Sequence, residues 1–337
     1  MRVWELRNRF ALDDLQPSER PNPEPGTGEV LLRMRAASLN YRDTLVVRGG
    51  YGPRVTLPLI PVSDGVGEIT AIGPGVEGLA IGERVCPVFF QSWPGGPPAQ
   101  AKFAVTLGGP LDGVLAEWMC LPQTGVVRVP EHLSDAQAAC LPCAALTAWS
   151  ALIEQGRIAP GETVLIQGTG GVALFALQFA KLAGARVIIT SSSEEKLARA
   201  RDLGADEGIN YRTTADWDRV VKDFTGGEGC DHVIELGGAE TLERSIRAAR
   251  IGGTLSLIGV LSGAAAKVPL PLVVMRNLKL QGVTVGSRDA FVAMLRAIAA
   301  GRLQPVVDRI FDFDHVRDAF ASFEADRAFG KVCIRIT

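Results

Sequence analysis

The chain has 337 residues, which is longer than most single domains and predicts two. Its 35 lysines and arginines nearly balance its 37 aspartates and glutamates, and the formal charge of −2 argues against nucleic acid or an anionic membrane as the main partner. No apolar run is long enough to cross a bilayer, and the first residues carry no apolar signal core. The six cysteines mostly lie inside apolar runs, so we expect a reducing, cytoplasmic location.

The first third of the chain consists of short apolar runs separated by glycine and proline. Such runs are typical of strands in a mostly antiparallel, barrel-like unit. Residues 91–110, which include the sequence PGGPP, predict a surface loop with little regular structure. The predicted strands span residues 28–34, 65–72, 83–90 and 113–121.

After residue 127, predicted strands alternate with predicted helices. Six strands with intervening helices predict a doubly wound parallel sheet of the Rossmann type, and therefore an α/β fold. We assign residues 127–286 to this Rossmann-type domain, and residues 1–126 and 287–337 to the barrel-like domain. The predicted strands are 163–167, 186–190, 208–210, 231–236, 253–259 and 278–285, and the predicted helices are 172–183, 193–203, 216–224 and 240–250. A helix near 290–300 and a strand at 331–336 are expected to return to the first domain.

A glycine-rich turn separates the first strand of the second domain from its first helix. Its sequence, Gly168-Thr169-Gly170-Gly171-Val172-Ala173, matches the dinucleotide fingerprint, with alanine in place of the third glycine. Gly168 permits a tight turn, and Gly170 lets the backbone approach a pyrophosphate at the helix N-terminus. We therefore predict that residues 168–172 bind a dinucleotide.

The end of the next strand indicates which dinucleotide binds. An NAD site usually has a carboxylate here for the ribose 2′-hydroxyl. This strand instead ends in three serines, and the first carboxylate is Glu194. Ser191 and Ser192 offer hydroxyls to a 2′-phosphate, while Lys196 adds positive charge and Tyr211 a further donor. This cluster predicts NADP(H) over NAD(H), although the serines could instead cap the helix and Lys196 could be a surface lysine.

Four further motifs carry a resemblance to a known family. They are SLNYRD at 38–43, PVSDGVGE at 61–68, LPCAALTAW at 141–149, and PGE at 160–162 before the glycine turn. In this order they resemble the medium-chain dehydrogenase/reductase superfamily over essentially the whole chain, and in particular its zinc-free, quinone-oxidoreductase-like branch. The resemblance implies an oxidoreductase whose barrel-like unit is a GroES-like catalytic domain.

The resemblance also implies that no metal is bound. Zinc alcohol dehydrogenases of the superfamily carry a cysteine where this chain has Asn40 or Tyr41, and a histidine at the position of Ser63. Cys143 matches the one ligand that remains, and a single thiol cannot hold a catalytic zinc ion. Residues 91–113 contain none of the four cysteines of the family's structural zinc loop.

The remaining histidines and cysteines do not complete a metal site in the sequence. The three histidines, His132, His232 and His315, lie in charged surroundings and are expected to face solvent. Cys140 and Cys143 form a CxxC pair with no second pair nearby. We expect two buried small residues here, although a dithiol redox role stays open.

The resemblance assigns roles to several residues of the expected site. Asn40 would lie beside the nicotinamide and donate its amide to a substrate carbonyl. Tyr51 matches a tyrosine that related enoyl-thioester reductases use as proton donor, although it could merely line the pocket. Arg42 and Asp43 are expected to form a structural pair under the site. The remaining implied cofactor contacts are Thr147, which would orient the nicotinamide, and Gly259, Val260, Leu261, Val285, Gly286 and Ser287 near the carboxyl ends of late strands.

These expectations favour one function and leave two others open. Without zinc, the site lacks the Lewis acid that alcohol oxidation uses. The residues therefore favour NADPH-dependent reduction of a small-molecule enone, quinone or related carbonyl compound. The alternatives are an alcohol dehydrogenase and a non-catalytic NADPH-binding redox sensor. Residues 278–285 could form an exposed sheet edge, and the family's habit of pairing such edges predicts a homodimer.

Overall fold

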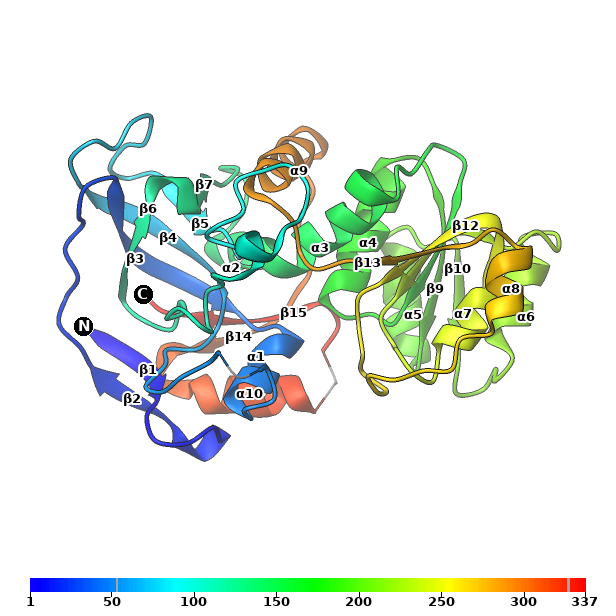
Figure 1. The fold of residues 1–337 in the computed structure, drawn as a ribbon, viewed down its shortest axis with the longest axis horizontal. Coiled ribbons are helices and arrows are strands. Elements are labelled where there is room, and N and C mark those ends of the chain that lie inside the picture. Colours follow the sequence, from blue (N-terminus) through cyan, green and yellow to red (C-terminus); the bar gives the residue numbers. More distant parts are fainter. Residues whose placement is uncertain (53, 326–327) are drawn as a thin grey trace. The chain divides into compact units, whose positions relative to one another are not determined.

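The computed structural model describes residues 1–52, 54–325 and 328–337, which form two compact units (Figure 1). The first unit consists of Met1–Leu146 and Gly286–Thr337, and the second of Thr147–Val285. The first boundary lies beyond the predicted residue 126, because helix α2 (Asp135–Ala139) packs against strands of the first unit.

The first unit is built around a mostly antiparallel sheet of seven strands in the described part of the chain. The strand order is β14-β15-β3-β4-β5-β7, and β6 pairs with β3 beside this path. Only β14 and β15 pair in parallel within this sheet as described. The predicted barrel-like architecture is thereby confirmed. The strands are β3 (Glu29–Ser38), β4 (Asp64–Ile72), β5 (Arg84–Pro87), β6 (Trp118–Pro122), β7 (Val126–Arg128), β14 (Val307–Asp312) and β15 (Lys331–Arg335).

Strand β3 anchors the first unit because both its sides are paired. Val30, Leu32 and Met34 alternate with more accessible neighbours and are fully buried, as expected for a strand with one apolar face. The carboxyl-terminal strand β15 pairs with the end of β3, with Cys333 opposite Ser38. This pairing explains why the last residues of the chain return to the first unit.

Short elements complete the first unit. Two strands that the sequence did not predict, β1 (Arg2–Leu6) and β2 (Leu15–Glu19), form a separate antiparallel pair. The helices are α1 (Tyr41–Val47), α2, α9 (Arg288–Gly301) and α10 (Val316–Glu324), and α3 (Leu146–Trp149) crosses the boundary. No helix among the described residues is both long enough and apolar enough to span a membrane.

The second unit contains the predicted doubly wound sheet (Figure 1). Its six strands are parallel in the order β10-β9-β8-β11-β12-β13, so the order reverses beside β8. Ligands of such sheets bind at the carboxyl ends of the strands at this reversal. The strands are β8 (Thr163–Gln167), β9 (Arg186–Ser191), β10 (Glu207–Asn210), β11 (Cys230–Glu235), β12 (Ala249–Leu257) and β13 (Lys279–Gly282). The helices are α4 (Gly171–Leu182), α5 (Glu194–Asp202), α6 (Trp217–Phe224), α7 (Leu242–Ala248) and α8 (Leu270–Met275).

The last strand is shorter than predicted. β13 ends at Gly282 rather than at residue 285, and all of its residues are exposed at one edge of the sheet. Val285 adopts a left-handed backbone with φ of 50°, which is incompatible with continuing a strand. Two π-helical turns, Leu141–Ala145 and Ser150–Gln155, were also not predicted.

One histidine lies where the sequence analysis did not expect it. His232 is buried, and its Nε2 lies 2.9 Å from Glu162 Oε2. The prediction was wrong because His232 belongs to β11, which lies inside the sheet between β8 and β12. His315 is exposed as expected, and His132 is half-buried.

Candidate functional site

The glycine-rich turn of the second unit has the geometry that a dinucleotide requires. β8 ends at Gln167, Gly168 adopts φ of 75°, and α4 begins at Gly171. A Cβ added at Gly168 or Gly170 would meet no atom within 4 Å, so both glycines border open space. No side chain caps α4, so the N–H groups of its first turn remain available to an anion. Residues 168–172 can therefore hold a pyrophosphate.

A buried polar network beneath this turn was missed by the sequence analysis. Gln167 Oε1 accepts hydrogen bonds from the N–H groups of Leu236 (3.0 Å) and Gly237 (2.9 Å), and Gln167 Nε2 donates to Glu235 Oε2 (2.8 Å). Glu235, which is 1% exposed, also accepts from Ser245 Oγ. The network fixes the loop after β11, at the sheet end where the dinucleotide is expected. Its sequence signal was a polar residue closing each of two apolar strands.

The predicted 2′-phosphate residues gather at the ends of β9 and β10. Ser191 is buried, and its backbone oxygen accepts the N–H of Tyr211 at 3.1 Å. Ser193 Oγ accepts the N–H of Lys196 at 3.3 Å, so the helix-cap interpretation holds for Ser193. Ser192 lies between these two serines and is partly exposed, and Tyr211 is 45% exposed.

The residues expected near the nicotinamide are divided between the two units. Thr147, Val285 and the segment 259–261 belong to the second unit, whereas Gly286 and Ser287 belong to the first. Val260 and Leu261 are exposed after β12, and a Cβ at Gly259 would lie 2.0 Å from the Leu236 oxygen. Gly259 is therefore required for the close approach of two loops within the second unit. Ser287 Oγ caps α9 by accepting the N–H of Ala290 at 3.1 Å.

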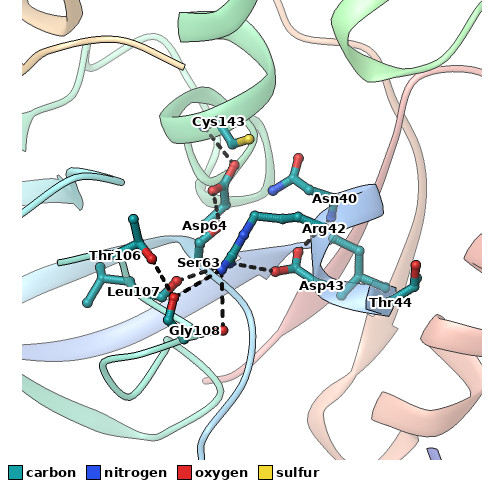
Figure 2. A network of polar contacts seen from close by, with 12 residues as sticks. Asn40, Arg42, Asp43, Thr44, Ser63, Asp64, Thr106, Leu107, Gly108 and Cys143 are labelled. Carbon is teal, nitrogen blue, oxygen red and sulfur yellow. Dashed lines mark hydrogen bonds and ion pairs between the residues drawn. The ribbon is translucent and has the colours of Figure 1, made fainter. Parts of the chain in front are cut away.

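The first unit contains a buried polar cluster around Asp64, the first residue of β4 (Figure 2). Asp64 Oδ1 accepts the Ser63 hydroxyl at 2.7 Å, and Oδ2 accepts the backbone N–H of Cys143 at 2.9 Å. Burial raises the pKa of Asp64, and the charge of Lys331 together with the Asn40 amide opposes this rise. The cluster thus brings together three segments that the family motifs singled out.

Asn40 lies beside this cluster, just before α1. Its backbone N–H donates to Asp43 Oδ2 at 2.8 Å, and its Oδ1 accepts from Lys331 Nζ at 2.6 Å. Asn40 Nδ2 is buried and makes no hydrogen bond within 3.5 Å among the residues described, although it lies near enough to Asp64 to help lower the pKa of that carboxyl. Figure 2 shows this amide nitrogen on the side that faces Asp64 and Cys143. A buried unpartnered donor costs about 1–3 kcal/mol, so a ligand that accepts from it would be favoured.

The predicted Arg42–Asp43 pair is present and buried. Arg42 Nη1 lies 3.2 Å from Asp43 Oδ1 and also donates to the Leu107 oxygen at 3.0 Å. Burial raises the pKa of Asp43 to about 6, although the charge of Arg42 opposes this rise. The Arg42 guanidinium also lies 4.3 Å from the centre of the Tyr51 ring, which is 38% exposed. Tyr51 therefore packs on the structural pair.

The two cysteines of the CxxC motif have different surroundings. Cys140 Sγ lies 3.5 Å from Cys333 Sγ and 3.6 Å from Ser38 Oγ, and all three residues are buried. Cys143 lies in the Asp64 cluster and is only partly buried, so the predicted burial holds for Cys140 but not for Cys143. Desolvation and the Asp64 carboxylate strongly raise the pKa of the Cys143 thiol. The Cys143 thiol is therefore neutral at physiological pH.

Comparisons with known proteins agree with this architecture. The family described as "Alcohol dehydrogenase GroES-like domain" matches residues 26–131, and "Zinc-binding dehydrogenase" matches residues 171–300. A zinc-type alcohol dehydrogenase-like protein of Schizosaccharomyces pombe is 40% identical over 331 residues, covering 96% of each chain. The chain belongs to the medium-chain dehydrogenase/reductase superfamily. It is an NAD(P)-dependent oxidoreductase that binds a nicotinamide dinucleotide and acts on a small-molecule substrate.

Two solved structures illustrate the chemistry found on this fold. An NAD-dependent alcohol dehydrogenase is 36% identical, with complete coverage of both chains and a TM-score of 0.91. A crotonyl-CoA carboxylase/reductase in complex with NADP is 25% identical, covers 99% of this chain and 94% of its own, and has a TM-score of 0.91. The same architecture thus carries both alcohol dehydrogenases and reductases.

Proposed function

We propose that this member of the superfamily is an NADPH-dependent, zinc-independent reductase of an enone, a quinone or a related carbonyl compound. The observation that carries the proposal is the buried Asn40 Nδ2, which the resemblance places at or beside the position where zinc enzymes of the family hold a cysteine ligand. A hydrogen-bond donor at this position can stabilise the negative charge that develops on a carbonyl oxygen, which is the role of the zinc ion in the zinc enzymes.

The residues of the first unit supply binding and charge stabilisation. A nicotinamide dinucleotide held by residues 168–172 would supply a hydride for the electrophilic carbon of the substrate. The electron pair of the C=C or C=O bond moves onto the carbonyl oxygen, and Asn40 Nδ2–H donates to that oxygen as its negative charge develops. A proton from solvent or from the Tyr51 phenol then completes the reduction, and Arg42 holds the Tyr51 ring.

The donor set supports a zinc-free site. Zinc in proteins is bound by thiolate, imidazole or carboxylate groups. Of the family's ligand positions, one falls on Asn40 or Tyr41 and one on Ser63, so only the Cys143 thiol is a group of the kind that zinc binds. The Lys331 ammonium, 2.6 Å from Asn40 Oδ1, would also repel a dication. These residues do not fit a zinc ion, and we derive no step through one.

The ends of β9 and β10 support NADPH. The strand-end position that carries a ribose-binding carboxylate in NAD enzymes is occupied by Ser191 and Ser192. The nearby Glu194 carboxylate is engaged, because its Oε1 accepts from Asn210 Nδ2 at 2.8 Å. Hydroxyls, a lysine and the Tyr211 phenol suit a 2′-phosphate better than a free carboxylate would.

The exposed edge of the second unit supports a homodimer. All four residues of β13 are exposed, and apolar side chains of α8, the helix that precedes it in the chain, are also exposed, among them Leu270 (66%), Val274 (69%) and Met275 (76%). An open strand edge with apolar neighbours favours pairing with a second copy. Analytical ultracentrifugation would contradict the dimer by finding only monomer at micromolar concentration.

Turnover assays test the proposed reaction. The purified enzyme is given NADPH or NADH with an enone, a quinone, an aldehyde or an alcohol, with and without a zinc chelator. We expect NADPH-dependent reduction that the chelator leaves unchanged. N40A should lower kcat about 100-fold, because it removes the donor to the developing oxyanion. N8A, which removes an exposed asparagine of the same unit, is the matched control. Loss of activity with chelator, or alcohol oxidation alone, would favour an alcohol dehydrogenase.

A further inference from the structure

Lys331 is a buried lysine whose contacts the family motifs did not anticipate. It is 2% exposed and is the first residue of β15. Its Nζ donates to the Leu39 backbone oxygen at 2.5 Å and to Asn40 Oδ1 at 2.6 Å. The register of β15 on β3, with Cys333 opposite Ser38, carries Lys331 alongside Asn40 at the point where β3 ends.

The chemistry of these contacts fixes which way the Asn40 amide faces. A lysine ammonium group has three donors and no acceptor, so the group that it bonds on Asn40 must be the oxygen. The amide is planar, and its nitrogen is therefore turned away from Lys331. That nitrogen is the buried Nδ2 without a partner among the described residues, and it faces Asp64 and Cys143 (Figure 2).

We propose that Lys331 is a positioning residue that holds the Asn40 amide with its NH2 group toward the substrate carbonyl. The inference deepens the proposed function and rests on it for the role of the Asn40 donor, but the orientation of the amide is a separate claim. Without the ammonium group, Asn40 Oδ1 and the Leu39 oxygen both lose the hydrogen bond from Lys331, and among the described residues only the capping box with Asp43 still holds the Asn40 side chain. The amide would then gain a hydrogen bond by rotating its nitrogen toward Leu39, away from the substrate.

A purely electrostatic role for Lys331 makes different predictions. Lys331 also faces the buried carboxylates of Asp43 and Asp64, whose charges it partly compensates. If compensation were its whole role, removing the charge would lower the thermal stability but leave the Asn40 amide in place. The test therefore needs a signal from the amide itself.

The experiment follows the Asn40 side-chain NH2 resonances in ¹⁵N-labelled protein. They are assigned by their absence from N40D, and K331M is compared with wild type and with K102M. Lys102 is a matched control because it also donates two hydrogen bonds within the first unit, to the backbone oxygens of Gly95 and Pro97. We expect K331M to shift the Asn40 pair and K102M to leave it in place. The hydrogen bond that the rotated amide gains lowers the fraction of molecules in which the Asn40 NH2 group faces the substrate. We therefore expect kcat to fall about tenfold. The affinity for NADPH should stay unchanged.

The outcomes separate the inference from the proposed function. Unmoved Asn40 resonances and a wild-type kcat in K331M would overturn the positioning role, even if the protein is less stable. A shifted pair together with a fully active N40A would support the orientation but refute Asn40 as the oxyanion donor. If K331M does not fold, K331M is compared with wild-type Lys331 in the D43N background, where one buried carboxylate fewer is left without compensation. Unmoved Asn40 resonances and an unchanged kcat in that pair would equally overturn the inference.

Discussion

The buried Asp43 carboxylate should leave a measurable signature in the pH dependence of stability. Burial raises its pKa from 3.8 to about 6, and this difference corresponds to about 3 kcal/mol. Between these two values the folded protein keeps a proton that the unfolded chain has released. The unfolded state therefore binds fewer protons, and stability falls as the pH rises through this window. D43N cannot ionise and lacks this contribution.

The assay is urea unfolding of wild type and D43N between pH 4 and 7. We expect the free energy of unfolding of wild type, relative to D43N, to fall by about 3 kcal/mol over this range and then to level off. D206N is a control of opposite sign, because a hydrogen bond from Lys181 lowers the pKa of Asp206. For this control the range extends down to about pH 2, because wild type should gain stability relative to D206N as the pH rises toward about 4, where the unfolded chain releases the proton that the folded protein has already lost from Asp206. A difference between wild type and D43N that stays constant or increases with pH would refute the assigned burial.

Three further perturbations test separate parts of the molecule. S192D should weaken NADPH binding more than tenfold and NADH binding far less, because its carboxylate would repel the 2′-phosphate. Fluorescence titration measures both affinities, and equal losses would contradict the assignment of Ser192 to the 2′-phosphate site. C143A should retain most of the activity, because Cys143 contributes its backbone N–H to Asp64 and its neutral thiol is not needed. A loss of activity comparable to that of N40A would instead support Cys143 as a metal ligand. F320A should cost about 3–5 kcal/mol in urea unfolding, because Phe320 is fully buried in the core of the first unit; a change below 1 kcal/mol would contradict that packing.

Local patterns in the sequence were sufficient to predict the second unit. The run at 163–167 became β8 with the same bounds, because continuous apolar residues mark a strand buried on both faces. The glycine-rich turn was also predicted from local sequence, because Gly168 adopts a positive φ that few other residues tolerate. β13 was overextended because the apolar run continues to residue 285, while the backbone of Val285 turns away from the sheet.

The sequence indicated some residues of the candidate catalytic cluster but not the residues that contact them. The family motifs identified Asn40, and the adjacent Arg42–Asp43 pair was predicted because the two residues are neighbours. The partners of Asn40 and Cys140 were not found, because Lys331 and Cys333 lie about 300 and 200 residues away in the chain.

The sequence by itself determined the family, the strands of the doubly wound sheet and the glycine-rich turn, because each is recognised from residues close together in the chain. The tertiary structure alone decided which polar groups are satisfied inside the first unit. When β15 pairs with the end of β3, Lys331 meets Asn40 Oδ1 and leaves Nδ2 without a partner among the residues described. The direction of that amide depends on the pairing of two strands that are far apart in the sequence, so no local sequence pattern predicts it.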